Sequence, residues 1–154
     1  MKPGVFTQLY VHIVFAVKYR ERLLTKEMRD ELFRYISGII TNRKHKVIII
    51  NGVLDHIHIL IGLNPNDKIS DLVGCIKRES SSFINEKKWF RGKFHWQEGY
   101  GAFTYSRSQL DNIYKYISNQ ETHHSKRTFR AEYLALLERF EVKFDEKYLF
   151  EFFD

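Results

Sequence analysis

Cysteine is nearly absent from this chain of 154 residues, since Cys75 is its only example. A single cysteine forms no disulfide within the chain and no zinc site of several thiolates, a pattern typical of proteins in a reducing compartment. The sequence also lacks an apolar run near the roughly 20 residues that a membrane span needs, and its start lacks a basic segment followed by an apolar run. We therefore expect an unprocessed cytoplasmic protein that has no membrane partner.

Linkers, internal repeats and low-complexity segments are absent as well. Apolar residues make up 44% of the chain and aromatic residues 16%, which excludes a disordered chain and allows a substantial core. We therefore predict a single domain over residues 1–154. The net charge of +6 and the pI of about 9.4 are compatible with an anionic partner, although charge alone does not establish a nucleic acid.

The apolar periodicity predicts alternating strands and helices. We expect strands over residues 9–17, 47–50, 53–63 and 99–105, and helices over residues 26–42, 68–86, 106–121 and 128–140. Thr25, Ser106 and Thr128 are placed to cap three of the helices. Asn51-Gly52 suits a tight turn and Asp55 offers a second position for it, so an antiparallel hairpin is expected there. This order is typical of an α+β fold of the ferredoxin-like or RRM-like plan, an antiparallel sheet with covering helices.

His56-Ile57-His58 is the first group of residues that could carry chemistry. Side chains alternate along a strand, so both imidazoles leave one face of the sheet while Ile57 leaves the other. Two imidazole nitrogens can hold a divalent cation, but a third protein ligand would still be needed. An isolated pair of this kind is more often two ordinary sheet histidines, so the motif alone leaves both interpretations open.

The predicted helix over residues 106–121 carries a second group. Its buried stripe is expected from four residues at helical spacing, Leu110, Ile113, Tyr114 and Ile117. Tyr116 and Gln120 lie one turn apart on a polar flank beside that stripe, so a nucleophile and a ligand could share this edge. A tyrosine and a glutamine at this spacing are common on helices, and the pair becomes informative only together with the histidines.

Basic and aromatic residues are interleaved between residues 77 and 96. The cations that could contact the phosphates of a nucleic acid are Lys77, Arg78, Arg91 and Lys93. The rings that could stack on the bases of a single strand are Phe83, Trp89, Phe90, Phe94 and Trp96. The alternative is a set of core rings beneath a solvated basic loop, and we expect this of about half of them.

These segments together resemble a known family, the single-tyrosine HUH transposases of small bacterial and archaeal insertion sequences, with the related REP-associated tyrosine transposases. The resemblance covers nearly the whole chain. It rests on the order and spacing of His12-Ile13-Val14 with Lys18-Tyr19-Arg20, Asp55-His56-Ile57-His58-Ile59-Leu60, Lys77 with Ser80 and Ser81, Trp96-Gln97-Glu98-Gly99-Tyr100-Gly101-Ala102-Phe103, and Tyr116-Ile117-Ser118-Asn119-Gln120 with His123-His124. Leu54 stands where the family often has proline, and Tyr105 where it has a small aliphatic residue, so the subgroup stays open.

The resemblance implies a ferredoxin-like fold in which a C-terminal helix carries the nucleophilic tyrosine, Tyr116. It implies His56, His58 and Gln120 as the ligands of Mg²⁺ or Mn²⁺. It also implies a homodimer that cleaves and rejoins single-stranded DNA with hairpin ends, through a 5′-phosphotyrosine intermediate. The general base for the tyrosine is not identified, and a metal-bound water and His123 are the alternatives.

Two other functions remain open from the sequence. A noncatalytic or domesticated module of the same fold would bind single-stranded nucleic acid through its basic and aromatic residues, and its histidines would be incidental. A replication or plasmid-transfer initiator would nick single strands by the same chemistry, but the short chain and the late tyrosine helix argue against it.

Overall fold

A computed structural model describes residues 3–18, 24–122 and 128–145. The motif residues that lie outside this part of the chain are Tyr19-Arg20 and His123-His124. Among the described residues, no helix is both long and apolar enough to cross a bilayer.

Strands and helices alternate in the order that the periodicity predicts. The elements are β1 (Tyr10–Ala16), α1 (Lys26–Asn42), β2 (Lys46–Gly52), β3 (His56–Gly62), α2 (Ile69–Lys87), β4 (Gly101–Tyr105), the 3₁₀ turn η1 (Arg107–Gln109), α3 (Leu110–Ser118) and α5 (Phe129–Arg139). The capping predictions are confirmed, because the Thr25 and Thr128 hydroxyl oxygens accept from backbone N–H groups of α1 and α5. The predicted capping box is also present, since Ser106 N–H donates to Oε1 of Gln109 at 3.0 Å.

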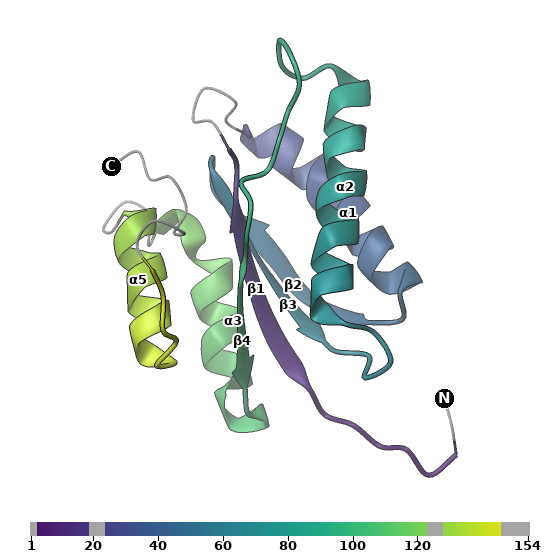
Figure 1. The fold of residues 1–154 in the computed structure, drawn as a ribbon, viewed down its shortest axis with the longest axis vertical. Coiled ribbons are helices and arrows are strands. Elements are labelled where there is room, and N and C mark those ends of the chain that lie inside the picture. The colour runs from purple at the N-terminus through teal and green to yellow at the C-terminus, as the bar shows by residue number, and fades with distance from the viewer. Residues whose placement is uncertain (1–2, 19–23, 123–127, 146–154) are drawn as a thin grey trace.

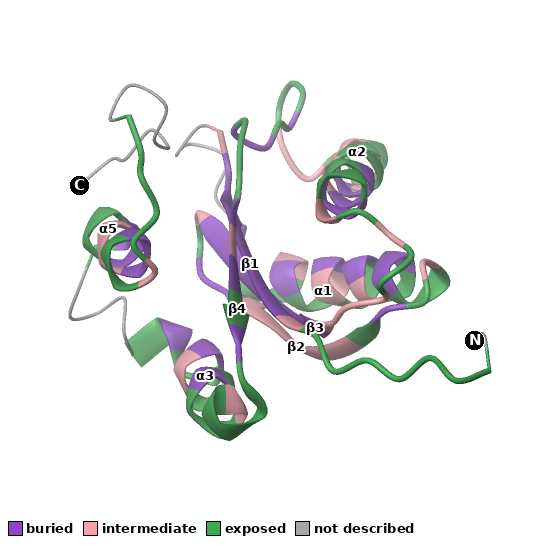
Figure 2. Cartoon of the chain, turned by 60° about the horizontal axis from the view of Figure 1, so that its bottom comes forward, coloured by how far each residue is buried: buried purple, intermediate pink, exposed green. Residues whose placement is uncertain are grey.

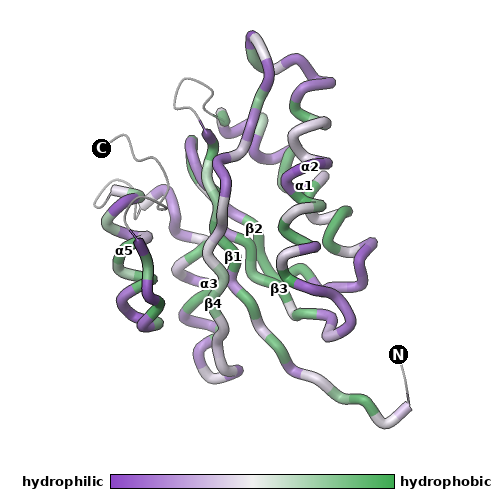
Figure 3. Tube along the Cα trace, in the orientation of Figure 1, coloured by the Kyte–Doolittle hydropathy of each residue, from purple (hydrophilic) through white to green (hydrophobic). Residues whose placement is uncertain are grey.

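The four strands form one antiparallel sheet in the order β2-β3-β1-β4, with β3 and β1 at its centre. Their β-branched and aromatic residues favour an extended backbone, and Figure 3 shows β2 and β3 as largely hydrophobic segments. Two helices, α1 and α2, cover one face, whereas α3 and α5 cover the other (Figure 1 and Figure 2). This arrangement confirms the predicted α+β, ferredoxin-like architecture.

Alternation along the two central strands gives the two faces different chemistry. Ile57 and Ile59 of β3 lie in the apolar core under α1 and α2, together with Phe15, the β1 partner of Ile57. His56 and His58 leave the opposite face, toward α3 and α5, as the sequence predicts. All five side chains are buried, so the α3 and α5 face holds polar groups without exposing them to bulk water.

The turn between β2 and β3 differs from its prediction. Asn51 and Gly52 do not form the turn, because they lie in β2 opposite His58 and Ile57, and the chain reverses after them near Asp55, the second predicted position. Gly52 does not adopt a positive φ angle, and its role in the hairpin is to allow a close approach of two backbone segments. A Cβ atom at this position would collide with the backbone carbonyl of His56, so the hairpin closes tightly only with glycine.

The buried stripe of α3 also differs from its prediction. Ile113 and Ile117 are buried, but Tyr114 is 45% exposed, so its assignment to the core is wrong. The helix is rotated because the Asn51 side chain of β2 donates to the carbonyls of Ile117 and Ser118 at 2.9 and 3.2 Å. This contact ties the end of α3 to the sheet. It directs the flank that carries Tyr116, rather than Tyr114, toward the histidines.

Candidate metal and nucleophile site

Two histidines of β3 and one carboxylate of α5 converge at the polar face of the sheet. Oε1 of Glu132 lies 3.0 Å from Nε2 of His58 and 3.3 Å from Nε2 of His56. One ligand atom from each of the three side chains lies within 4.8 Å of the others, and all three residues are buried. Strand alternation places the imidazoles together, whereas the packing of α5 over β3 brings the carboxylate to them.

Gln120, the ligand expected from the resemblance, lies in the same cluster. Its Oε1 is 3.3 Å from Nε2 of His56, and its Nε2 donates to Oε2 of Glu132 at 3.4 Å. The structure thus brings His56, His58 and Gln120 together and adds Glu132, which sequence reasoning missed. An acidic residue in the first turn of a capped helix is ordinarily explained by the helix dipole, so the sequence carried no separate signal for it.

The outer nitrogen of each imidazole is held by another residue. Nδ1 of His56 donates to Oδ1 of Asp55 at 2.9 Å, because a carboxylate can only accept. Nδ1 of His58 lies 2.7 Å from Nε2 of His12, and the two rings stack with centroids 5.0 Å apart. Nδ1 of His12 in turn faces the Tyr105 hydroxyl at 3.4 Å. Both histidines are therefore held with Nε2 directed at the shared point, as ligand imidazoles are in metal sites.

The electrostatics of the cluster favour charge at its centre. Burial lowers the pKa of His12 well below its usual value, and the charge of His58 lowers it further, so His12 is neutral. Burial also acts to lower the pKa of His56, but hydrogen bonds to Asp55 and Glu132 outweigh burial and raise it. Burial acts to raise the pKa of Glu132, yet hydrogen bonds from both histidines hold it well below its ordinary value. An anionic Glu132 facing two imidazoles and an amide oxygen is a donor set that fits Mn²⁺, or Mg²⁺ with waters.

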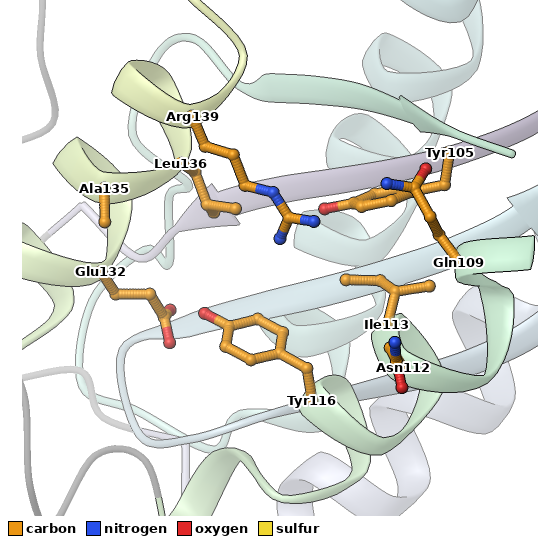
Figure 4. A pocket seen from close by; sticks show the side chains of 9 residues that line it. All are labelled: Tyr105, Gln109, Asn112, Ile113, Tyr116, Glu132, Ala135, Leu136 and Arg139. Carbon is orange, nitrogen blue, oxygen red and sulfur yellow. The ribbon is translucent and has the colours of Figure 1, made fainter.

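Tyr116 reaches this cluster from α3. Its ring lies edge-on to the His58 ring, with centroids 5.9 Å apart and an interplanar angle of 88°. Figure 4 shows its hydroxyl directed toward the carboxylate of Glu132. The phenol and the two histidines, which are far apart in the sequence, are therefore neighbours within one chain.

A cavity of about 340 Å³ opens beside Tyr116 (Figure 4). It lies between the end of β4, η1, α3 and α5. Its walls are Tyr105, Gln109, Asn112, Ile113, Tyr116, Glu132, Ala135, Leu136 and Arg139. Because Tyr116 and Glu132 belong to both the cavity and the cluster, a molecule in the cavity would contact the candidate nucleophile.

The predicted DNA-contacting cations lie elsewhere. Lys77 and Arg78 belong to α2, on the opposite face of the sheet, and Arg91 and Lys93 are exposed in the loop that follows α2. The Lys77 ammonium donates to the carbonyls of Gln97 and Gly99 at 2.8 and 2.5 Å, and burial lowers its pKa to about 8. Lys77 therefore anchors the segment that leads into β4.

The aromatic residues of the same region divide between core and surface. Phe94 and Trp96 are buried, and the Trp96 indole donates to the Ser80 hydroxyl at 2.9 Å. Phe83, Trp89 and Phe90 are partly buried against the core. Two of the five rings thus lie in the core and three at its margin, and stacking of these three on bases stays a prediction.

A four-stranded antiparallel sheet of this kind, covered by helices, is also the fold of a solved tyrosine transposase. The family model described as "Transposase IS200 like" matches residues 5–120. The chain belongs to this family. Membership gives it a transposase role, that of an enzyme that cleaves and transfers DNA.

Individual relatives agree with the family. The chain is 31% identical over 124 residues to the ISDra2 transposase TnpA of Deinococcus radiodurans, which covers 76% of this chain and 87% of that protein. It is 28% identical over 114 residues to the transposase of insertion sequence element IS200 from Salmonella typhimurium, covering 71% and 74% of the two chains. A solved REP-associated tyrosine transposase bound to a REP hairpin shares the fold, with a TM-score of 0.61 at 14% identity over 80% of this chain and 74% of that chain.

Proposed function

We propose that this protein cleaves and rejoins single-stranded DNA, with Tyr116 as the nucleophile and His56, His58 and Gln120 as ligands of Mg²⁺ or Mn²⁺. One observation carries the proposal. The Tyr116 ring packs against His58, with its hydroxyl directed at the carboxylate on which both histidine Nε2 atoms converge. A nucleophile and a cation site that act on one phosphodiester must be neighbours in this way.

The chemistry is a transesterification that balances without a nucleotide cofactor. The Tyr116 oxygen attacks phosphorus, a new bond forms between them, and the bond from phosphorus to the 3′ oxygen breaks. The phenol gives up its proton and the departing 3′ oxygen gains one, so the product is a 5′-phosphotyrosine and a free 3′ hydroxyl. Because a phenol has a pKa near 10, far below that of an alkyl alcohol, a later 3′ hydroxyl can displace it and reseal the strand. When bound, the divalent cation supplies positive charge against the phosphate.

Glu132 completes the cation site in this proposal. Its carboxylate stays anionic because both histidines lower its pKa, so it is a poor acceptor for the phenol proton and a good source of charge for a cation. His123, one of the two candidates for the general base, lies outside the described residues. Asp55 and His12 orient the two imidazoles and do not contact DNA in this scheme.

We further propose that the substrate has hairpin ends and that the protein acts as a homodimer. The REP-associated relative of the same fold was solved with a REP hairpin, which supports the first point. Arg78, Arg91 and Lys93 are exposed and contact phosphates of the DNA in this proposal. Lys77 contributes by holding the carbonyls of Gln97 and Gly99, which orients the segment between that loop and β4.

Covalent capture tests the proposed function. The protein is mixed with a labelled pool of hairpin-bearing single-stranded oligonucleotides and Mn²⁺, and denaturing gels are used to detect a labelled protein adduct. We expect the wild type and Tyr114→Phe to form the adduct, because Tyr114 is exposed on the same helix, and Tyr116→Phe to form none. An adduct on Tyr116→Phe would exclude Tyr116 as the nucleophile. DNA binding without any adduct would favour the noncatalytic binding module.

A further inference from the structure

The cavity beside Tyr116 has a composition that the cleavage chemistry does not require. One wall is apolar or aromatic, formed by Tyr105, Ile113 and Leu136, and the amides of Gln109 and Asn112 lie at its edge. Its volume of about 340 Å³ is in the range of small-ligand sites, which start at roughly 300 Å³. The combination of an apolar wall and a few polar groups is typical of a pocket that holds a base or another flat heterocycle.

The charges of the cavity occupy different places. Among the described residues that line the cavity, Glu132 supplies the only carboxylate, next to Tyr116, and Arg139 supplies the only cation. Figure 4 shows the Arg139 side chain extending from α5 toward the hydroxyl end of Tyr105. The centre of the guanidinium lies 5.8 Å from the centroid of the Tyr105 ring and 5.6 Å from that of Phe140. Within the described part of the chain, no carboxylate lies at ion-pair distance from the Arg139 guanidinium.

We infer that this cavity binds the nucleotide adjacent to the scissile phosphate, with its base against Tyr105, Ile113 and Leu136 and its other phosphate on Arg139. The inference rests on the proposed function, since it takes Tyr116 as the residue that the scissile phosphate meets. A nucleotide within a strand has a phosphate on each side. The cavity has Tyr116 beside Glu132 for one phosphate and the guanidinium for the other, which matches that arrangement.

The electrostatics assign the two phosphates to their places. The cavity places a carboxylate, Glu132, at one position and a guanidinium, Arg139, at another, so a phosphate bound without a cation goes to Arg139. A guanidinium binds a phosphate through paired N–H donors, and it does so while stacked on an aromatic ring. The Asn112 amide is then placed to meet the edge of the base, as asparagine does in base readout.

Titration with free nucleotides tests the site without metal or cleavage. The probes are the four deoxynucleoside 5′-monophosphates and the corresponding deoxynucleosides, added to the full-length protein in chelator, and the methyl NMR signals of Ile113 and Leu136 are followed. We expect a monophosphate to shift both signals. We expect Arg139→Ala to weaken its binding by about tenfold or more, as the loss of a charge-assisted contact does. Arg139→Lys should keep part of the affinity, whereas Arg130→Ala, at an exposed arginine of the same helix, should keep all of it.

The nucleosides, which lack the phosphate, allow the loss of the phosphate to be compared with the loss of the Arg139 guanidinium. Removing the phosphate should weaken binding to the wild type by the same factor as Arg139→Ala, and should change little in that variant, because the lost contact is the same one. The inference is overturned if monophosphates leave Ile113 and Leu136 unshifted, or if Arg139→Ala and Arg130→Ala weaken binding equally. The titration and the covalent capture are independent measurements on the wild-type protein. Failure of the covalent capture with intact nucleotide binding would therefore reject the proposed cleavage and keep the pocket.

Discussion

Two clusters in this chain join a buried histidine to a carboxylate, and they are built differently. In the first, Nε2 of His45 lies 2.8 Å from Oδ2 of Asp67, and its Nδ1 accepts from the backbone N–H of Asn64 at 2.9 Å. Arg43 donates two further bonds to the same carboxylate, at 2.6 and 2.8 Å. Both ring nitrogens of His45 and both oxygens of Asp67 are thus committed to groups that join the end of α1 to the connection after β3.

The second cluster leaves its donors directed at one point. The Nδ1 atoms of His56 and His58 are held from behind, while both Nε2 atoms face the single Oε1 of Glu132. Within the described residues, its carboxylate makes hydrogen bonds with imidazole and amide groups and none with an arginine. The comparison shows that contact between histidine and carboxylate does not by itself indicate a site. A site is indicated when the Nε2 atoms of two histidines converge on one point while other residues hold their Nδ1 atoms.

Removal of one imidazole whose Nε2 atom faces Glu132 should have the largest effect on Mn²⁺ affinity. We expect His58→Ala to lower Mn²⁺ affinity by more than the roughly 10- to 100-fold that loss of an outer partner costs, because a ligand itself is removed. His45→Ala should leave Mn²⁺ affinity unchanged and lower the melting temperature, since His45 only joins structural elements. Isothermal titration with Mn²⁺ and thermal unfolding measure the two effects. Equal Mn²⁺ affinity in both variants would remove the distinction between the clusters.

Neutralising the shared carboxylate should have the next largest effect. Glu132→Gln keeps the size of the side chain and removes its charge, so we expect Mn²⁺ to bind about 10- to 100-fold more weakly, a loss of about 1.4 to 2.8 kcal/mol. Glu138→Gln, at an exposed position of the same helix, is the matched control. If both variants bind Mn²⁺ as the wild type does, Glu132 is only a buried partner of the histidines.

Removal of His12, the residue that faces Nδ1 of His58, should have a smaller effect on Mn²⁺ affinity. His12→Phe leaves Nδ1 of His58 without its acceptor, and we expect Mn²⁺ affinity to fall by about tenfold, at the lower end of the range for outer partners. His12→Gln should restore most of the affinity, because its amide can accept from His58 and donate toward Tyr105. ¹⁵N NMR of the protein saturated with Mg²⁺, in which Nε2 of His58 is a ligand, should show the proton of His58 on Nδ1, donated to Nε2 of His12. A proton found on Nε2 of His58 instead would contradict the positioning role.

The smallest effect should be on the stability that the cluster of Arg43, His45 and Asp67 contributes, and it should depend on pH. The hydrogen bond from Arg43 holds the pKa of Asp67 well below its usual 3.8, and His45 adds to this effect. Since the folded-state pKa is lowered, its contribution to stability is present above about pH 4 and is lost as the pH falls toward the folded-state value. Asp67→Asn should lower the melting temperature at pH 7, and the difference from wild type should shrink below pH 4. Asp71→Asn, exposed in the first turn of α2, should show no such convergence.

Several features of the site could be predicted because they depend on local periodicity. The two-residue repeat of a strand places His56 and His58 on one face wherever the strand lies, and the structure confirms this. The turn of a helix likewise places Tyr116 and Gln120 on one flank. The prediction for Tyr114 failed because helical spacing marks which residues share a face and does not say how far the helix is rotated. The hydrogen bonds from Asn51 set that rotation.

The sequence by itself therefore determined the order of strands and helices, their caps, the family and the residues that could act together. Tertiary structure alone decided that Glu132 meets the histidines, that His12 and Tyr105 support His58, and that Lys77 serves the loop before β4. The physical reason is the separation along the sequence over which each interaction acts. Periodicity and capping act between residues a few positions apart, whereas these contacts join segments on different elements, whose approach depends on how the helices pack against the sheet.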